Sequence, residues 1–361
     1  MKIGIAVLGA GRWGIHLIRN FLEHPQSKIL AVVDPHPERL AAVRRQFDLG
    51  GDVLLATDWS AVQELPGLEA VAIATPASTH SALIARALRQ GYHVLAEKPL
   101  TLNLTEAIEL CQLAEKQQRQ LFVDHTYLFH PAVEEGKNII QQRKLGTLRY
   151  GYAQRTHLEP VRHDVDALWD LAIHDLSIFN TWLGQTPIRV QAKGTVFINR
   201  ENLELGKVTN YKLPLYDLVW IELTYPEGFQ AFIHLCWLNA DRQRRLTVVG
   251  SNGTLIFNDL STDAPLILKP GYLEAYGENS DGSTTAWNPV RDRNLFIDRT
   301  WDILAVESVE PLRQVCDRFL NCIQNNTPSP ISSGWAGVEL VRILSALSES
   351  LKLGGHPIKL C

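Results

Sequence analysis

The stretch that most constrains the fold is residues 9–14, a GxGxxG pattern set between an apolar run and a helical segment. Residues 2–8 predict a strand buried on both faces, and the chain up to about residue 23 predicts a helix. Glycines at such a junction allow a tight turn and bring the backbone close to a pyrophosphate, at the positive end of the helix. The pattern therefore predicts dinucleotide binding by Gly9, Gly11, Arg12, Trp13 and Gly14.

An acidic residue stands where a bound dinucleotide presents its adenosine ribose. The apolar run of residues 28–33 ends in Asp34, twenty residues after Gly14. A carboxylate there accepts hydrogen bonds from the ribose hydroxyls and repels a 2′-phosphate, which favours NAD, with NADP kept as the lesser alternative because Arg39 is near. Asp34 also fits as the cap of a helix over residues 36–47, with Pro35 at its first position. The two roles are compatible.

Strand-like and helix-like segments alternate through the first third of the chain. Strands are predicted at residues 68–74, 92–96 and 121–124, with helices ending near residue 89 and at residues 103–116. This alternation predicts an α/β fold with a doubly wound parallel sheet. The carboxyl ends of such strands meet at one edge, so Thr75, Pro76 and His80 are expected to close over the nicotinamide half of the cofactor, a plain capped turn being the alternative.

Residues Glu97 and Lys98 follow the strand at residues 92–96 and precede Pro99. Proline lacks an N–H and favours an extended conformation for the residue before it, so the backbone that presents Lys98 is stiff. Because ligands bind at this end of a parallel sheet, Lys98 is predicted to be a cation at the rim of a cleft. A solvated Glu–Lys pair at a strand end is the alternative.

The composition changes after Asp124, which divides the chain into predicted domains of residues 1–124 and 125–361. A helix over residues 168–183 carries Asp170 and His174, four residues apart on one face, where they are expected to hydrogen-bond. A carboxylate beside an imidazole raises its basicity and fixes its tautomer, as a general base near neutral pH requires. A surface ion pair is the alternative, but the largely apolar helix favours a cleft.

The glycine-rich turn, Thr75-Pro76 with His80, and Glu97-Lys98-Pro99 at these spacings resemble the Gfo/Idh/MocA oxidoreductases. The resemblance is close over the first half and weaker towards the end of the chain. It implies an N-terminal Rossmann domain and a C-terminal α+β domain with a large, open, mostly antiparallel sheet. It also implies a triad of Lys98, Asp170 and His174, in which the lysine contacts cofactor and substrate.

The segment from Arg155 to Asp175 resembles the branch of the family that acts on sugars and nucleotide-linked sugars. Where many members have a glycine-rich segment, this chain has Trp-Asp-Leu-Ala-Ile, so the individual substrate stays open. Arg155, His157 and Arg162 are candidates to bind a carboxylate or phosphate, a solvated strand and loop being the alternative. The full set of expected substrate contacts is Lys98, Tyr127, Arg155, His157, Arg162, Trp169, Asp170 and His174.

These observations predict an NAD-dependent dehydrogenase of a sugar or nucleotide-linked sugar. His174 is the expected base, Asp170 orients it, Lys98 stabilises the alkoxide, and Glu97 positions Lys98. The alternatives are a free-sugar or cyclitol dehydrogenase, a keto-sugar reductase that uses NADPH, and a non-catalytic NAD-sensing regulatory protein on the same fold.

The second half also alternates in short β-like runs. Strands are predicted at residues 147–157, 189–198, 217–225, 230–237, 245–249 and 254–257, with turns that suit a meandering antiparallel sheet. Residues 277–293 predict a long loop, and helices are expected at residues 132–143, 309–324 and 335–353. The outer sheet face, with Trp220, Phe232 and Trp237, is expected to form a homodimer or homotetramer contact.

Composition and net charge limit the kinds of partner that the chain can bind. The chain has 361 residues, enough for two cores, and a net charge of −4 gives no basic surface for nucleic acid or anionic membrane. No apolar run approaches the roughly 20 residues of a membrane span, and no signal peptide fits before the first strand. Five scattered cysteines without a CxxC pattern indicate reduced thiols and a cytoplasmic location, and no ligand cluster indicates a metal.

Overall fold

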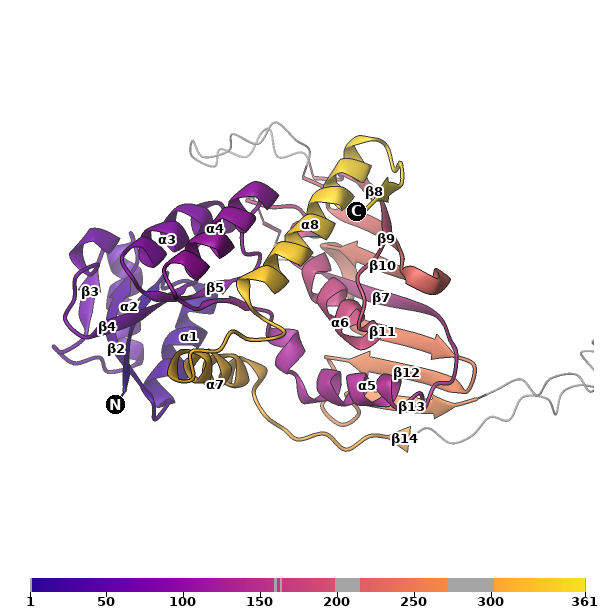
Figure 1. The fold of residues 1–361 in the computed structure, drawn as a ribbon, viewed down its shortest axis with the longest axis horizontal. Coiled ribbons are helices and arrows are strands. Elements are labelled where there is room, and N and C mark those ends of the chain that lie inside the picture. Colours follow the sequence, from indigo (N-terminus) through magenta and orange to yellow (C-terminus); the bar gives the residue numbers. More distant parts are fainter. Residues whose placement is uncertain (1, 159–160, 163, 199–214, 272–301, 361) are drawn as a thin grey trace, which may run out of the picture.

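The structure is a computed structural model that describes residues 2–158, 161–162, 164–198, 215–271 and 302–360. It contains two sheets, a parallel one near the N-terminus and a larger one on the other side of a set of helices (Figure 1). The predicted loop at residues 277–293 lies outside the described residues.

The first sheet has six parallel strands in the order β3-β2-β1-β4-β5-β6. Its strands are β1 Ile3–Leu8, β2 Ser27–Val33, β3 Leu54–Ala56, β4 Leu68–Ile73, β5 His93–Glu97 and β6 Leu121–Asp124. Its helices are α1 Arg12–Glu23, α2 Pro37–Gln46, α3 Ala77–Arg89 and α4 Leu104–Lys116. The predicted doubly wound parallel sheet is confirmed. The three-residue strand β3 was not predicted, because so short an edge strand leaves little pattern in the sequence.

Alternate side chains of the central strands enter two different cores. Ile5 and Val7 of β1 pack with α1, α2 and the later helix α7 (Pro311–Gln324) on one face of the sheet. Ala6 and Leu8 pack with α3, α4 and the later helix α8 (Gly334–Lys352) on the other face. A strand buried on both faces is uniformly apolar, which is why these runs were recognisable in the sequence.

Helix α2 begins later than predicted. Its first residue is Pro37 and its N-cap is His36, so Pro35 does not open the helix. The expected role of Asp34 as a cap is limited to one contact, in which its carboxylate accepts a hydrogen bond from the backbone N–H of His36 at 2.9 Å.

The second sheet has nine strands in the order β14-β13-β12-β11-β7-β10-β9-β8-β15. The strands are β7 Leu148–Leu158, β8 Arg189–Thr195, β9 Leu218–Thr224, β10 Gln230–Cys236, β11 Leu238–Gly250, β12 Gly253–Asn258, β13 Leu266–Pro270, β14 Asp302–Ile303 and β15 Ile358–Lys359. The expected mostly antiparallel sheet is confirmed, but it is not a simple meander, since β7 lies between β10 and β11 and runs parallel to β10.

One face of this sheet is covered by helices α5 (Pro131–Gln141), α6 (Ile173–Leu183) and α8 (Figure 1). The other face exposes aromatic side chains, including Trp220 at 54% and Phe232 at 41%. The prediction that Trp237 belongs to this exposed face is wrong, because Trp237 is 0% exposed. In β10 the odd-numbered residues point to the helices, and Trp237 continues that alternation.

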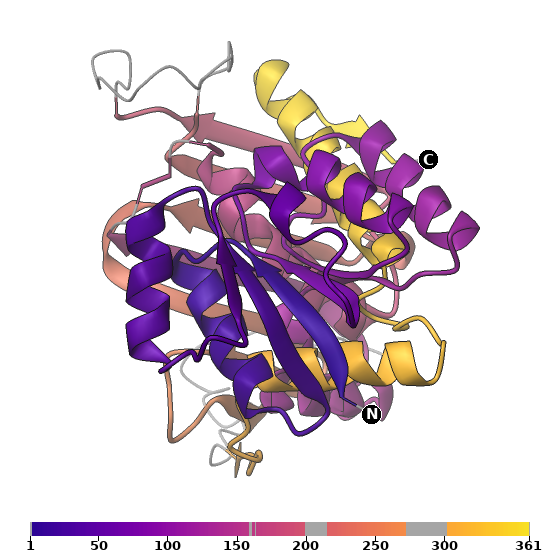
Figure 2. The ribbon, with the colours of Figure 1, turned by 90° about the vertical axis from the view of Figure 1, so that its left-hand side faces the viewer.

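The chain returns to the first sheet near its end. Val123 of β6 donates a backbone hydrogen bond to Ser332 at 2.8 Å, and α7 and α8 flank the parallel sheet (Figure 2). The six-stranded sheet ends at Asp124, where the sequence suggested a domain boundary, and we keep the division at 124/125 as a proposal. No helix among the described residues is long and apolar enough to cross a membrane.

Candidate active site

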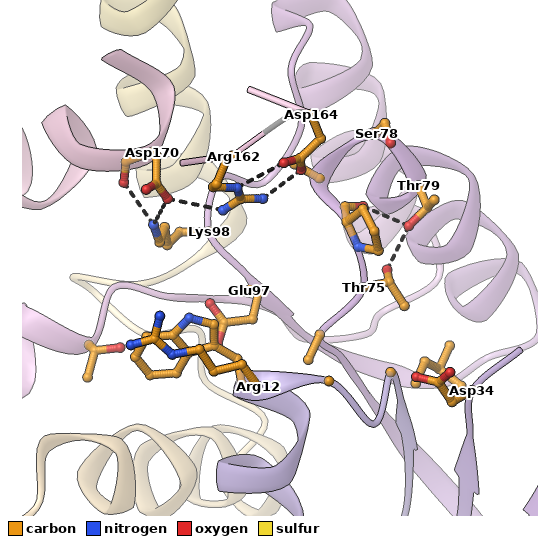
Figure 3. A pocket seen from close by; sticks show the side chains of 18 of the residues that line it. Arg12, Asp34, Thr75, Ser78, Thr79, Glu97, Lys98, Arg162, Asp164 and Asp170 are labelled. Atoms are coloured by element: carbon orange, nitrogen blue, oxygen red, sulfur yellow. Dashed lines mark hydrogen bonds and ion pairs between the residues drawn. The ribbon is translucent and has the colours of Figure 1, made fainter. Parts of the chain in front are cut away.

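A cavity of about 2550 Å³ lies between the carboxyl ends of the parallel strands and the nine-stranded sheet. Its walls come from the loops after β1, β2, β4 and β5 on one side, and from β7, β11 and the start of α6 on the other. Figure 3 shows this cavity from close by. Its position agrees with the rule that ligands bind at the carboxyl edge of an open parallel sheet.

The glycine-rich turn has the geometry that a dinucleotide requires. Gly9 has a φ of +98°, and a Cβ on Gly14 would lie 1.8 Å from the carbonyl oxygen of Gly9. A Cβ on Gly11 would instead meet nothing within 4 Å, so the space beside it is open to a phosphate. Gly11 is also the N-cap of α1, with Arg12 and Trp13 directly after it on the cavity wall. These residues fit a bound pyrophosphate.

Asp34 lies at the end of β2 on the same wall. Its carboxylate accepts hydrogen bonds from the backbone N–H of Ala10 at 2.8 Å and of His36 at 2.9 Å, and Arg39 lies 3.5 Å away. Burial raises the pKa of Asp34, but these hydrogen bonds and the charge of Arg39 outweigh it, so the pKa lies below its usual value. Asp34 is thus a carboxylate anchored beside the ribose end of the predicted cofactor site.

The loop after β4 is connected to the loop after β5. Thr75 and Pro76 line the cavity, whereas His80 is 1% exposed and does not. The ring nitrogens of His80 lie 2.8 Å from the carbonyl oxygen of Pro99 and 3.0 Å from that of Thr75. His80 therefore holds two cavity loops together without facing the cavity itself, which differs from its expected place beside the nicotinamide.

Lys98, directly after β5, reaches across the cavity to the turn that precedes α6. Its Nζ donates to the backbone carbonyl of Asp170 at 2.8 Å and to Asp170 Oδ1 at 3.2 Å. Arg162 donates to the same Oδ1 at 3.0 Å and pairs through its fork with Asp164 (Figure 3). Burial raises the pKa of Asp170, but Lys98 and Arg162 outweigh it and lower the pKa to about 2. Asp170 is therefore a permanent anion that binds two cations.

The predicted hydrogen bond between Asp170 and His174 is absent from the described structure. The two residues do share a stretch of helix, a π turn over Leu168–Ala172 that continues into α6. The carboxylate of Asp170 turns to Lys98 and Arg162 instead, because charge-assisted bonds to cations are stronger than a bond to a neutral imidazole. Single π turns of this kind often occur at functional sites.

His174 faces the cavity and packs edge-on against the ring of Tyr127, with centroids 4.8 Å apart. Its pKa is well below its usual value, first because it is desolvated and then because Lys98, Arg155 and Arg244 are cationic neighbours. The imidazole is therefore neutral near pH 7 and available as a proton acceptor.

Arg155 serves mainly to hold other residues in place. It is 3% exposed and binds both carboxylate oxygens of Asp175, at 3.0 and 2.8 Å. It also donates to the hydroxyl of Tyr127 at 3.0 Å and lies over the ring of that tyrosine. Buried side chains held by bidentate ion pairs are fixed in position, so Arg155 orients the tyrosine that packs on His174.

Two further residues of this wall were not identified as site residues from the sequence. Arg244 of β11 and Asp259, one residue past β12, pair at 3.1 Å, and the hydroxyl of Tyr127 donates to Asp259 at 2.8 Å. Arg244 lies opposite Arg155 in the register of β11 with β7. Only that strand pairing, which the sequence pattern did not predict, brings them to the cavity.

The remaining predicted substrate contacts divide into two groups. His157 and Arg162 line the cavity, as do Tyr127 and Arg155. Trp169 does not: its indole N–H donates to Ser348 of α8 at 2.9 Å and its side chain packs against both hydrophobic cores. We therefore do not retain Trp169 as a substrate contact, since the side chain next to Asp170 on a helix points to a different face.

Glu97, which lines the cavity beside Lys98, belongs to a pair of buried acids. Glu97 and Asp124 are neighbours in the register of β5 with β6, and they are 7% and 0% exposed. Burial raises the pKa of both, and the mutual repulsion of the two carboxylates raises that of Glu97 further. Within the described structure Glu97 Oε1 and Asp124 Oδ2 have no hydrogen-bond partner. The pair therefore favours holding a proton.

Models of one family match both parts of the chain. The model for an oxidoreductase family with an NAD-binding Rossmann fold matches residues 3–125, and the model for the GFO/IDH/MocA C-terminal domain matches residues 133–256.

Individual relatives agree with these matches. The UDP-N-acetylglucosamine 3-dehydrogenase of Acidithiobacillus ferrooxidans is 33% identical over 48% of this chain and 52% of its own length. The scyllo-inositol 2-dehydrogenase (NAD⁺) of Bacillus subtilis is 30% identical over 57% of this chain and 61% of its own. The crystal structure of the WlbA dehydrogenase of Bordetella pertussis, in complex with NADH and UDP-GlcNAcA, shares the fold with a TM-score of 0.76, at 18% identity, over 100% of this chain and 99% of its own.

The buried ion pair gives a test of the role of Arg155. Arg155→Met leaves the carboxylate of Asp175 buried without its cation, so we expect the free energy of unfolding to fall by about 3–5 kcal/mol. Urea denaturation measures this change. Arg149→Met, at an exposed position of the same strand, is the control and should change stability little. A stable Arg155→Met protein would contradict the structural role.

The buried acid pair predicts a pH-dependent stability. Because the pKa of Asp124 is raised in the folded state, the wild type loses stability as the pH rises above the ordinary carboxyl range and the buried group ionises. Asp124→Asn cannot ionise and keeps an oxygen for the hydrogen bond from Thr126. We expect the variant to gain about 1–3 kcal/mol over the wild type between pH 4.5 and 8. An unchanged difference across these urea titrations would rule out the raised pKa.

Proposed function

We propose that this chain, which belongs to the Gfo/Idh/MocA family of oxidoreductases, is an NAD-dependent dehydrogenase that oxidises a secondary alcohol of a sugar or nucleotide-linked sugar. The observation that carries the proposal is the contact of Lys98 Nζ with Asp170, in the same cavity as the neutral His174 and the glycine-rich turn. A cation, a proton acceptor and a cofactor cradle are what alcohol oxidation requires.

The residues divide the work of the reaction among them. When bound, NAD supplies the acceptor for the hydride. The neutral imidazole of His174 takes the proton of the substrate hydroxyl, and Lys98 stabilises the negative charge that develops on its oxygen. Asp170 and Arg162 fix the ammonium of Lys98 in place, so little reorganisation is needed during the reaction.

We assign the cofactor as NAD rather than NADP. Gly9 and Gly11 with Arg12 hold the pyrophosphate, Gly14 allows α1 to pack closely against the turn, and the carboxylate of Asp34 accepts hydrogen bonds from the ribose hydroxyls. The anchored carboxylate of Asp34 has a lowered pKa and repels a 2′-phosphate. Arg39 lies 3.5 Å from that carboxylate and partly offsets its charge, which leaves NADP as the weaker ligand.

The substrate class rests on the relatives. One oxidises a UDP-linked sugar and another is an inositol dehydrogenase, so a cyclitol or free sugar is the second candidate. A keto-sugar reductase with NADPH is disfavoured by Asp34. A non-catalytic NAD sensor is not favoured, because it has no need for Lys98, Asp170 and His174 in one cavity.

We propose further that copies of this chain associate through the exposed face of the nine-stranded sheet. Tyr150, Tyr152, Trp220 and Phe232 are each at least 37% exposed there, and Trp220 stacks on His234 at 4.0 Å. Contiguous exposed aromatics on a sheet are typical of interfaces. A cytoplasmic location stays a prediction, which the free, buried thiols of Cys111, Cys236, Cys316 and Cys322 support.

Two substitutions test the catalytic assignment. Lys98→Met removes the charge but keeps most of the side-chain length, and His174→Gln removes the base. We expect kcat for NADH formation with UDP-N-acetylglucosamine, N-acetylglucosamine or myo-inositol to fall about 10²-fold or more in each, with the Kd for NAD changed only a few-fold. Lys116→Met, exposed on α4, is the control. Near-native turnover in either variant would contradict the catalytic assignment of that residue.

The interface proposal predicts a change of assembly state. We expect the wild type to sediment as a dimer or tetramer and Trp220→Glu to sediment as a monomer, because a charge in an apolar interface is costly to desolvate. Leu353→Glu, at a 53% exposed residue after α8, should leave the assembly intact. A monomeric wild type at micromolar concentration contradicts the proposal.

A further inference from the structure

The cations of the inner cavity already have carboxylate partners. These pairs are Lys98 and Arg162 with Asp170, Arg155 with Asp175, and Arg244 with Asp259. A guanidinium held in this way has its charge largely compensated and its donors occupied. Arg155 and Arg162, which the sequence suggested as ligands of a substrate anion, are therefore less suited to that role than an arginine without a carboxylate partner.

Arg242 is different. It lines the same cavity, is exposed, and forms no ion pair with any residue in the described ranges. Arg12 and Arg86 also lack one there. Arg12 lies in the glycine-rich turn, where the pyrophosphate of the cofactor is its natural partner, and Arg86 of α3 donates to the side chain of Gln63 at 2.7 Å. Arg242 is on the opposite sheet, in β11, and not on the wall that carries the glycine-rich turn.

A bulge in β11 directs Arg242 into the cavity. Leu238 pairs with Leu158 and Gln243 pairs with Thr156, so residues 239–242 of β11 span a stretch that β7 covers with His157 alone. Thr156 fixes this bulge, because its hydroxyl donates to the carbonyl of Asp241 at 2.7 Å and accepts from the N–H of Gln243 at 3.2 Å. Bulges beside binding sites commonly re-aim side chains.

Exposure along this wall rises from the buried Arg155, through Arg244 at 30% of its side chain, to the exposed Arg242. Arg242 therefore lies at the mouth, while Lys98, with a side chain 9% exposed, lies deep. The cavity of about 2550 Å³ exceeds the roughly 300–1,000 Å³ of a typical ligand site, which leaves room for an extended substrate beside the cofactor.

We propose that Arg242 binds an anionic group, a carboxylate or a phosphate, that the substrate carries at a distance from the carbon that is oxidised. This inference rests on the proposed function and narrows its substrate class, from any sugar or cyclitol to an acidic or phosphate-linked sugar. The planar fork of an arginine matches both anions through two parallel hydrogen bonds.

The test measures binding to the complex of the full chain with NADH, in which alcohols bind without turnover. The ligands are UDP-N-acetylglucosamine and D-glucuronate, with N-acetylglucosamine and myo-inositol as neutral counterparts. We expect Arg242→Gln to raise the Kd of at least one acidic ligand about tenfold or more and to leave the neutral ligands unchanged. Arg242→Lys should lose part of the affinity, and Arg149→Gln, at an exposed position outside the cavity, should lose none.

The outcome also shows which anionic group Arg242 binds, a diphosphate or a carboxylate. A loss confined to UDP-N-acetylglucosamine identifies a diphosphate, and one confined to glucuronate identifies a carboxylate. Equal affinities of the wild type and Arg242→Gln for both acidic ligands overturn the proposal, as does wild-type binding of neither. The proposed function fails separately, when ligands bind but no NADH forms from NAD⁺. In kinetics, a positioning role in binding predicts a raised KM with kcat nearly unchanged.

Discussion

The contact between Lys98 and Asp170 is the interaction on which the rest of the site depends. Lys98 follows the end of a parallel strand and Asp170 lies in the π turn before α6, so the contact joins the parallel sheet to the helix that carries His174. An ammonium on a side chain that is only 9% exposed is costly without such partners. The same contact therefore places the cation and joins the two walls of the cavity. Helix α7 supports the same docking, where Asp317 lies 2.6 Å from His24 of the first domain.

The fold of the first sheet was largely predictable, because its signals lie in short stretches of the sequence. The strands around residues 9–14 are buried on both faces, so their apolar runs and the glycines between them are specific. The second sheet was less predictable, because the insertion of β7 between β10 and β11 is a long-range pairing that alternation within one strand does not encode. The same limit concealed Arg244, which pairs with Arg155 of β7, and Arg242, which lies in the bulge that interrupts this pairing.

The candidate site shows the same division between residue identity and contact. Sequence spacing selected Lys98, Asp170 and His174, and all three line one cavity. Spacing did not identify the hydrogen-bond partners of these residues. The spacing of four residues suggested a bond between Asp170 and His174, whereas the carboxylate of Asp170 binds the cations Lys98 and Arg162 instead. Trp169 was also assigned to the site because of its position next to Asp170. Neighbouring residues on a helix face different surroundings, and the indole N–H of Trp169 donates to Ser348 instead.

The charges around His174 imply how the proposed reaction gains its rate. Burial lowers the pKa of the imidazole most, the cations Lys98, Arg155 and Arg244 lower it further, and no bond to Asp170 raises it. The site therefore does not rely on a strong base. The same ammonium that disfavours imidazolium stabilises an alkoxide, so the substrate hydroxyl becomes more acidic while its acceptor stays neutral. Under the proposed function Lys98 is then the main contributor and His174 the route by which the proton leaves.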